Sequence, residues 1–174
     1  MKRTLTVILS MAFLLLAGCL PEETVSKGPI AGATGSSEDP LPPSVELPFE
    51  TIDQGIRSGI RDARQVVIRD PESWRSLWGE HVKGRVPGPP LPQVDFVREM
   101  VIAFFLGEKP TAGYAANIRE IFVREGELVV KVYVQTPPPG VFLLQVLTQP
   151  FHIVKVGLSD LPVEFIVEEK HLKT

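Results

Sequence analysis

The 174-residue sequence contains one cysteine, Cys19, which lies close to the N-terminus. The rest of the chain therefore offers no disulfide framework, no thiolate zinc site and no cysteine nucleophile. Three histidines are present, His81, His152 and His171, and none has an Asp or a Cys beside it in the sequence. They could converge on zinc only through the fold, and three unrelated histidines are the simpler interpretation.

Catalytic signatures are also missing from the sequence. It contains no Gly-x-Ser-x-Gly, no His-Glu-x-x-His and no glycine-rich phosphate-binding loop. We therefore expect a protein that is not an enzyme and that uses no cofactor and no metal.

The chain lacks an excess of positive charge. It has 18 Lys and Arg against 21 Asp and Glu, a formal net charge of −3. A nucleic-acid partner would require a basic face, so we expect none. The scattered charges are typical of a solvated surface.

No apolar run is long enough to span a membrane. The run over residues 5–16 has about a dozen residues, whereas a bilayer core needs roughly twenty. It follows the basic Lys2 and Arg3 and ends in small residues, which is typical of a secretory signal peptide over residues 1–18. A plain secretory signal with an incidental cysteine is one interpretation of this segment.

The last four residues of that segment, Leu16-Ala17-Gly18-Cys19, resemble a bacterial lipobox. The resemblance implies that Cys19 carries fatty acyl chains such as palmitate and becomes the first residue of an extracytoplasmic, membrane-anchored protein of the bacterial cell envelope. Two or three acyl chains would anchor the protein stably, whereas one chain holds only weakly. Leu20 replaces the Asp that retains lipoproteins at the inner membrane, which favours the outer membrane of a Gram-negative cell.

Residues 19–48 have the composition of a flexible tether. They are rich in Pro, Gly and Ser and contain few large apolar residues, so they cannot bury enough surface to offset the entropy of ordering. A flexible coil of this length reaches about 30 Å. Residues 49–174 are long enough for one domain with a hydrophobic core.

One helix is predicted near the start of that domain. Asp70 is a good N-cap, and Pro71 suits the first helical position. The apolar residues that follow recur at helical spacing and place both tryptophans on one face: Trp74, Leu77, Trp78 and Val82. We interpret this face as core, with Gly84 closing the helix.

The rest of the domain has the patterns of strands. The apolar run over residues 100–106 predicts a central strand covered on both faces, and residues 114–124 and 128–135 predict a hairpin around Glu125-Gly126. Further strands are predicted over residues 64–69, 141–147, 151–156 and 163–167. Because strands follow strands, we expect an α+β, mainly β fold, an antiparallel sheet or sandwich with one N-terminal amphipathic helix.

Three loops rich in turn-forming residues interrupt these strands: residues 107–114, 136–140 and 148–152. Proline and glycine fix the backbone of such loops and lower the entropy lost on binding. An exposed Tyr114 or Phe151 would then be a rigid aromatic anchor for a partner. The alternative is that these loops are ordinary connections and both aromatics are core.

The loops also carry a family resemblance. Its segments are Val94-Asp95-Phe96, Met100-Val101-Ile102-Ala103 and Leu106-Gly107-Glu108-Lys109-Pro110-Thr111-x-Gly113-Tyr114, with Glu72-Ser73-Trp74 and Leu77-Trp78 upstream and Thr148-x-Pro150-Phe151-His152-Ile153-Val154 downstream. Together, over about residues 56–167, they resemble the C-terminal domain of the protease complex subunit PrcB family. Ala112 stands where the family usually has Gly. The family is named after a lipoprotein associated with a surface protease complex.

A second likeness concerns the first loop. Lys109-Pro110-Thr111-Ala112-Gly113-Tyr114 is similar to the Asn-Pro-Thr-Thr-Gly-Tyr loop of chagasin-like cysteine-protease inhibitors, which are immunoglobulin-like sandwiches. Gln149-Pro150-Phe151 is similar to their Arg-Pro-Trp loop. The middle loop here is rich in proline instead of glycine, and Ala116 replaces a tryptophan.

The resemblance to the PrcB family implies a lipid-anchored, non-catalytic subunit that binds or stabilises a protein partner such as a surface protease. The candidate partner-binding residues are Lys109, Pro110, Thr111, Gly113, Tyr114, Pro150 and Phe151. The alternatives are an inhibitor of cysteine peptidases and a structural envelope lipoprotein without a specific partner. This last alternative predicts that the three loops do not gather at one end of the fold.

Overall fold

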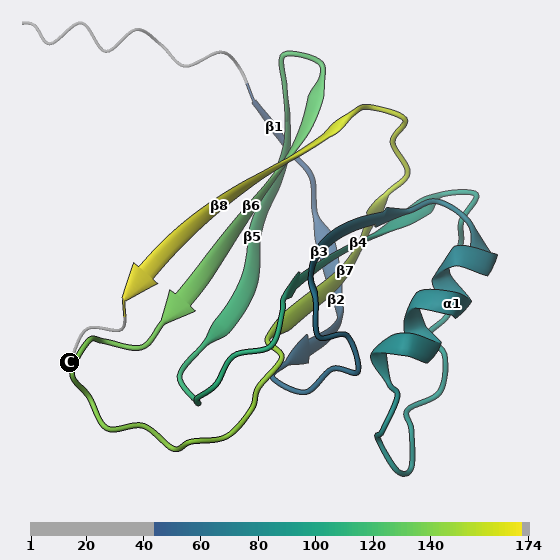
Figure 1. Ribbon diagram of the computed structural model, residues 1–174. Coiled ribbons are helices and arrows are strands. Elements are labelled where there is room, and N and C mark those ends of the chain that lie inside the picture. Colours follow the sequence, from purple (N-terminus) through teal and green to yellow (C-terminus); the bar gives the residue numbers. More distant parts are fainter. Residues whose placement is uncertain (1–43, 172–174) are drawn as a thin grey trace, which may run out of the picture. The chain divides into compact units, whose positions relative to one another are not determined.

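The computed structural model describes residues 44–171, so the predicted signal peptide, Cys19 and most of the predicted tether lie outside the described residues. The described chain forms two four-stranded sheets and one helix (Figure 1). The first sheet has the order β1 (Val45–Glu46), β5 (Ala115–Arg124), β6 (Glu127–Thr136), β8 (Val163–His171). The second has the order β2 (Phe49–Gly55), β7 (Phe151–Gly157), β4 (Glu99–Leu106), β3 (Ala63–Ile68). The mainly β architecture with one helix is therefore confirmed.

The predicted hairpin is present as β5 and β6. Its two-residue turn consists of Glu125 and Gly126, both with positive φ (53° and 84°). Two consecutive residues of positive φ form the turn type whose twist matches that of antiparallel strands. The alternation of apolar residues along β6 therefore places Leu128, Val130 and Val132 on the inner face.

The prediction of an antiparallel sheet is wrong for one pair, because β8 runs parallel to β6 over its whole length. The chain leaves β6, forms β7 in the other sheet and returns to the first sheet as β8. A parallel neighbour needs such a long connection, and local sequence patterns do not reveal it. The short β1 and the edge strand β2 were also not predicted, and β1 lies within the segment assigned to the tether.

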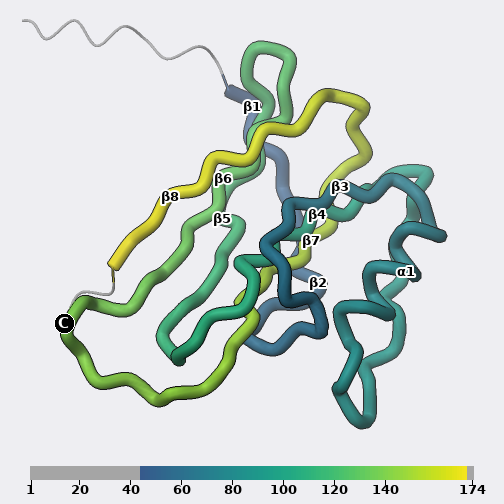
Figure 2. Tube along the Cα trace, in the orientation of Figure 1, coloured from purple at the N-terminus to yellow at the C-terminus, as the bar shows by residue number. Residues whose placement is uncertain are grey.

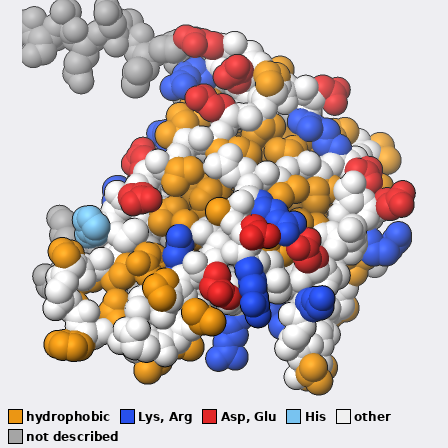
Figure 3. Space-filling model, viewed as in Figure 1, with side chains coloured by type: hydrophobic (Ala, Val, Ile, Leu, Met, Phe, Trp, Pro, Cys, Tyr) orange, Lys and Arg blue, Asp and Glu red, His pale blue; other side chains and the backbone are white. Residues whose placement is uncertain are grey.

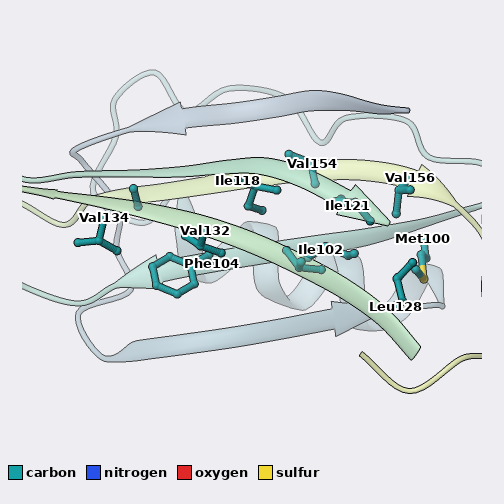
Figure 4. Close-up of a cluster of buried hydrophobic side chains, with 12 residues drawn as sticks. Met100, Ile102, Phe104, Ile118, Ile121, Leu128, Val132, Val134, Val154 and Val156 are labelled. Carbon is teal, nitrogen blue, oxygen red and sulfur yellow. The ribbon is translucent and has the colours of Figure 1, made fainter. Parts of the chain in front are cut away.

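The main core lies between the two sheets (Figure 4). β4 is an interior strand, and its side chains point alternately to the two faces of its sheet, as the apolar run predicts. Met100, Ile102 and Phe104 pack against the aliphatic residues of β5 and β6. Val101, Ala103 and Phe105 face the opposite side of the sheet.

Helix α1 (Pro71–His81) covers that opposite side. Asp70 accepts a hydrogen bond from the amide of Ser73 at 2.8 Å, which caps the first turn. Trp74 and Trp78 are buried, and Trp74 Nε1 donates to the carbonyl of Pro92 at 3.0 Å. The tryptophans are therefore core residues. Within residues 44–171, no helix is long and apolar enough to cross a bilayer.

Candidate functional site

The three loops that the sequence singles out lie together at one end of the two sheets. Residues 107–114 follow β4, and residues 137–150 connect β6 to β7, so the second and third loops belong to one long connection. Figure 2 shows this connection running beside the first loop. We call residues 107–114 and 137–150 the loop end. This clustering is evidence against the alternative that expected the loops to be dispersed.

Backbone hydrogen bonds join the first loop to the third. The amide of Lys109 donates to the carbonyl of Thr148 at 2.7 Å, and the amide of Thr148 donates back at 2.9 Å. The Thr148 hydroxyl donates to the carbonyl of Thr111 at 3.1 Å, and Gln149 Nε2 donates to Glu108 at 2.9 Å. These bonds hold residues 108–111 against residues 148–149 in the free protein.

Gly113 fixes the position of the second loop. Its φ of +94° belongs to a region that favours glycine, and a Cβ there would lie 3.2 Å from Pro137 Cβ. Gln135 Nε2 donates to the Gly113 carbonyl at 3.4 Å. Gly113, in the first loop, therefore lets the second loop lie close against it.

The predicted contact residues divide into two groups. Pro110 is exposed, and Lys109, Thr111, Gly113 and Tyr114 are half-buried. Lys109 Nζ lies 5.8 Å from the centre of the Tyr114 ring, a cation–π arrangement at the surface of the loop end.

Pro150 and Phe151 are buried, and Phe151 is only 1% exposed. Phe151 packs in the cluster beneath α1, where its ring centre lies 4.4 Å from that of His81. The expectation that Phe151 supplies contact area is therefore wrong, because the residue is the first of β7 and its side chain enters the core.

The sequence prediction also missed the most exposed apolar segment. Residues 141–147 do not form the predicted strand, and five apolar residues of this segment are exposed: Val141, Phe142, Leu144, Val146 and Leu147. Leu144 is 72% exposed and Phe142 is fully exposed. Figure 3 shows hydrophobic side chains gathered over the loop end. We call residues 141–147 the apolar segment.

A partly buried polar network, centred on the buried His81, lies next to the loop end. His81 Nε2 is 2.9 Å from Asp53 Oδ2, and His81 Nδ1 is 2.9 Å from Ser58 Oγ. Because a carboxylate only accepts, Nε2–H donates to Asp53 and Nδ1 accepts from the Ser58 hydroxyl. Arg85 donates to the same Asp53 oxygen at 3.0 Å. The residues come from separate segments, and their spacing in the sequence gives no signal of this network.

The electrostatics of this network favour a neutral imidazole. Burial lowers the pKa of His81 below its usual value, and the hydrogen bond to Asp53 offsets this only in part. Burial raises the pKa of Asp53, but hydrogen bonds from His81 and Arg85 outweigh this effect and leave the pKa below its usual value. The network joins the β2–β3 connection to the end of α1.

The three histidines have separate partners. His152 Nδ1 accepts from the amide of Ile118 at 2.8 Å, its Nε2 is 2.9 Å from Thr51 Oγ1, and burial lowers its pKa to about 4. His171 Nδ1 is 2.8 Å from Thr136 Oγ1. In the part of the chain that the structure describes, no three His, Cys, Asp or Glu side chains are placed to hold a metal ion.

The fold and the loop end define a β-sandwich domain whose strand connections form a preorganised surface. Residues 100–157 match the family model described as PrcB C-terminal. The match runs from β4 to β7 and includes the whole loop end, so the resemblance to the PrcB family is confirmed over this segment. No curated protein and no solved structure matches the chain.

Proposed function

We propose that this protein is a non-catalytic subunit that holds a protein partner, such as a surface protease, at the bacterial cell envelope. The match to the PrcB C-terminal family supports an association with a protease complex. The matched residues include the loop end, and this agreement links the family to the surface described above.

The observation that carries the proposal is the exposed apolar segment, which lies beside a loop held by hydrogen bonds. Contiguous exposed apolar patches on soluble domains commonly mark interaction sites. The hydrogen bonds between Lys109, Thr148 and Thr111 hold the neighbouring loop in place before binding. Binding therefore costs less ordering entropy, and Phe142 and Leu144 supply apolar contact area.

In this proposal the Ser58–His81–Asp53 network is structural and carries out no reaction. His81 is 0% exposed, and both ring nitrogens are engaged. Ser58 Oγ also accepts from the amide of Ile60 at 3.0 Å. These hydrogen bonds give the network a structural role in joining α1 to the β2–β3 connection.

The proposal includes a lipid anchor at Cys19, supported by the lipobox-like Leu16-Ala17-Gly18-Cys19. Residues 19–48 would then tether the domain to the membrane, the outer membrane in a Gram-negative cell. Cells grown with radioactive palmitate should label the natural chain but not a Cys19→Ala chain. Label that persists in the Cys19→Ala chain would contradict the anchor.

Site-specific photocrosslinking tests the partner-binding surface directly. A photoreactive amino acid replaces Phe142 in the full chain, and a matched chain carries it at Asp160, in the β7–β8 connection. In the bacterium that produces the protein, we expect one defined envelope protein to crosslink at position 142 and not at 160. Absence of a defined adduct at 142, or the same adducts at both positions, would count against the proposal.

Inhibition of a cysteine peptidase is a second candidate, favoured by the clustering of the three loops at one end. The burial of Phe151 weakens it, because the aromatic residue of the third loop is not available to enter a protease cleft. Assays of the full chain against papain distinguish the two. Inhibition at micromolar concentration would support this candidate, and activity that stays unchanged would remove it.

A further inference from the structure

A hollow of about 950 Å³ lies beside the apolar segment. It is bounded by the β2–β3 connection, by the turn after α1 and by residues 146–149 of the loop end. Residues that shape it include Ile56, Arg57, Lys83, Arg85, Leu147 and Gln149. Its size is at the upper end of the range for ligand sites, enough for a few residues of an extended chain.

The walls of the hollow combine apolar and basic side chains. Ile56, Val146 and Leu147 are exposed apolar residues from two different connections. Arg57 and Lys83 are exposed and, within residues 44–171, neither forms an ion pair. Such a lining suits a ligand that carries both apolar groups and negative charge.

The carboxylates in and near the hollow are already paired with cationic or hydrogen-bonding side chains. Asp53 is the only Asp or Glu among the described lining residues, and its carboxylate accepts from His81 and Arg85 at 2.9 and 3.0 Å. Glu80, on the nearby last turn of α1, is held by Arg64 at 2.6 Å. Within residues 44–171, Arg57 and Lys83 therefore keep their full positive charge at the hollow without an ion-pair partner, although Glu80 lies near enough to Lys83 for that charge to help lower the pKa of Glu80.

The hollow is fixed before any ligand binds. Arg85 donates to Asp53 and to the carbonyl of Arg57, and its guanidinium lies 5.5 Å from the centre of the Phe151 ring. Gly59 packs so closely on α1 that a Cβ would lie 2.2 Å from the Glu80 carbonyl oxygen. A backbone held in this way lowers the ordering cost of binding a ligand in the hollow.

We propose that this hollow binds an acidic, extended peptide segment of the partner. Apolar side chains of the segment would lie against Ile56 and Leu147, and its carboxylates would pair with Arg57 and Lys83. The inference rests on the proposed function, because it specifies the chemistry of the partner that the loop end holds.

The test uses the full-length protein in detergent and fluorescein-labelled octapeptides that share leucine and serine positions. The three peptides differ only at two positions, which are both glutamate in the first peptide, both glutamine in the second and both lysine in the third. Fluorescence anisotropy at low salt should show the glutamate peptide binding about tenfold more tightly than the glutamine peptide, and the lysine peptide more weakly still. Equal affinity for all three, or no binding by any, overturns the inference.

A pair of double variants locates the binding. Arg57→Glu/Lys83→Glu should abolish the preference for glutamate, whereas Arg75→Glu/Arg98→Glu changes the net charge equally at exposed positions outside the hollow and should preserve it. An equal effect of both double variants would mean that overall charge, not this hollow, sets the preference, and would overturn the inference.

The inference and the proposed function fail separately. If position 142 crosslinks a defined partner while the peptides show no charge preference, the partner binds the loop end without using the hollow. If the peptides bind as expected but no partner crosslinks at position 142, the hollow is an acidic-peptide site and the proposed function is wrong.

Discussion

Two short apolar runs, residues 101–106 and residues 141–147, lie in opposite surroundings in this molecule. The first forms most of β4, hydrogen-bonded to β3 and β7, and all but its last residue are buried. The second pairs with no strand in the described part of the chain, residues 44–171, and its apolar side chains are largely exposed. Both would score as strands by composition, so the difference comes from their position in the fold.

The position of the second run explains its exposure. It follows Pro137-Pro138-Pro139 and crosses from β6 in one sheet to β7 in the other. Both edges of β6 and both edges of β7 are already paired with other strands. Among the described residues, residues 141–147 are held by an isolated backbone bond from Ala112 N to the Leu144 carbonyl. The run therefore contributes little to the core, and its apolar side chains are exposed among the described residues.

The largest expected effect is a difference in the free energy of unfolding between a substitution in the buried run and one in the exposed run. Phe105→Ala removes a buried ring between β4 and α1 and should lower the free energy of unfolding by about 3–5 kcal/mol. Phe142→Ala should change it by no more than about 0.5 kcal/mol, because that side chain is fully exposed. Urea unfolding measures both values. A large loss for Phe142→Ala would show that the apolar segment packs on the protein.

The second prediction concerns the support beneath the hollow. Gly59→Ala places a methyl group against the Glu80 carbonyl and should cost about 2 kcal/mol, since the bond from the Gly59 amide to the His81 carbonyl must lengthen. Gly79→Ala, in helix α1 next to Glu80 and with open space around it, should instead stabilise the fold by about 1 kcal/mol. Thermal unfolding that moves both variants in the same direction would contradict the packing described.

The third and smallest effect is a loss of stability at acidic pH, and it comes from His152, which lies on the strand beside the buried run. His152, which pairs with Phe104 of β4, has a pKa lowered to about 4 by burial. The unfolded chain takes up a proton below about pH 6.5 and the folded chain does not, so stability is complete above that pH and is lost as the pH falls towards 4. From pH 6.5 to 5.5 the loss should be about 1 kcal/mol from this residue.

His152→Gln is the matched control, since its side-chain oxygen can still accept from the Ile118 amide. Its free energy of unfolding should fall less steeply between pH 6.5 and 5.5 than that of the natural chain. Some slope should remain, because burial also lowers the pKa of His81. Identical slopes for the two chains would mean that His152 is protonated in the folded state as readily as in the unfolded chain.

Features encoded in short stretches of sequence could be predicted. The N-cap Asp70 with Pro71 and the spacing of the tryptophans indicate α1, and the Glu125-Gly126 turn between alternating strands indicates the β5–β6 hairpin. The continuous apolar run indicates that β4 is covered on both faces. Each signal depends only on neighbouring residues.

Features that depend on pairing between residues far apart in the sequence could not be predicted. The parallel β6–β8 ladder, the burial of Phe151 beneath α1 and the exposure of residues 141–147 all follow from which strand edges are already occupied. The hydrogen bonds of His81 to Asp53 and Ser58 join residues from separate segments. The fold brings the three predicted loops together, but the exposed apolar surface lies on residues 141–147, which the sequence predicts as a strand.

The most direct test of the central claim is quantitative recovery of the envelope partner with the apolar segment altered. Phe142→Ser/Leu144→Ser removes two exposed apolar side chains, and Val97→Ser removes one that is also exposed but lies in the turn before β4. Mass spectrometry of crosslinked complexes should show at least about tenfold less partner with the double variant and no loss with Val97→Ser, with the fold of both intact. Equal recovery with the natural chain and the double variant would contradict a binding role for the loop end.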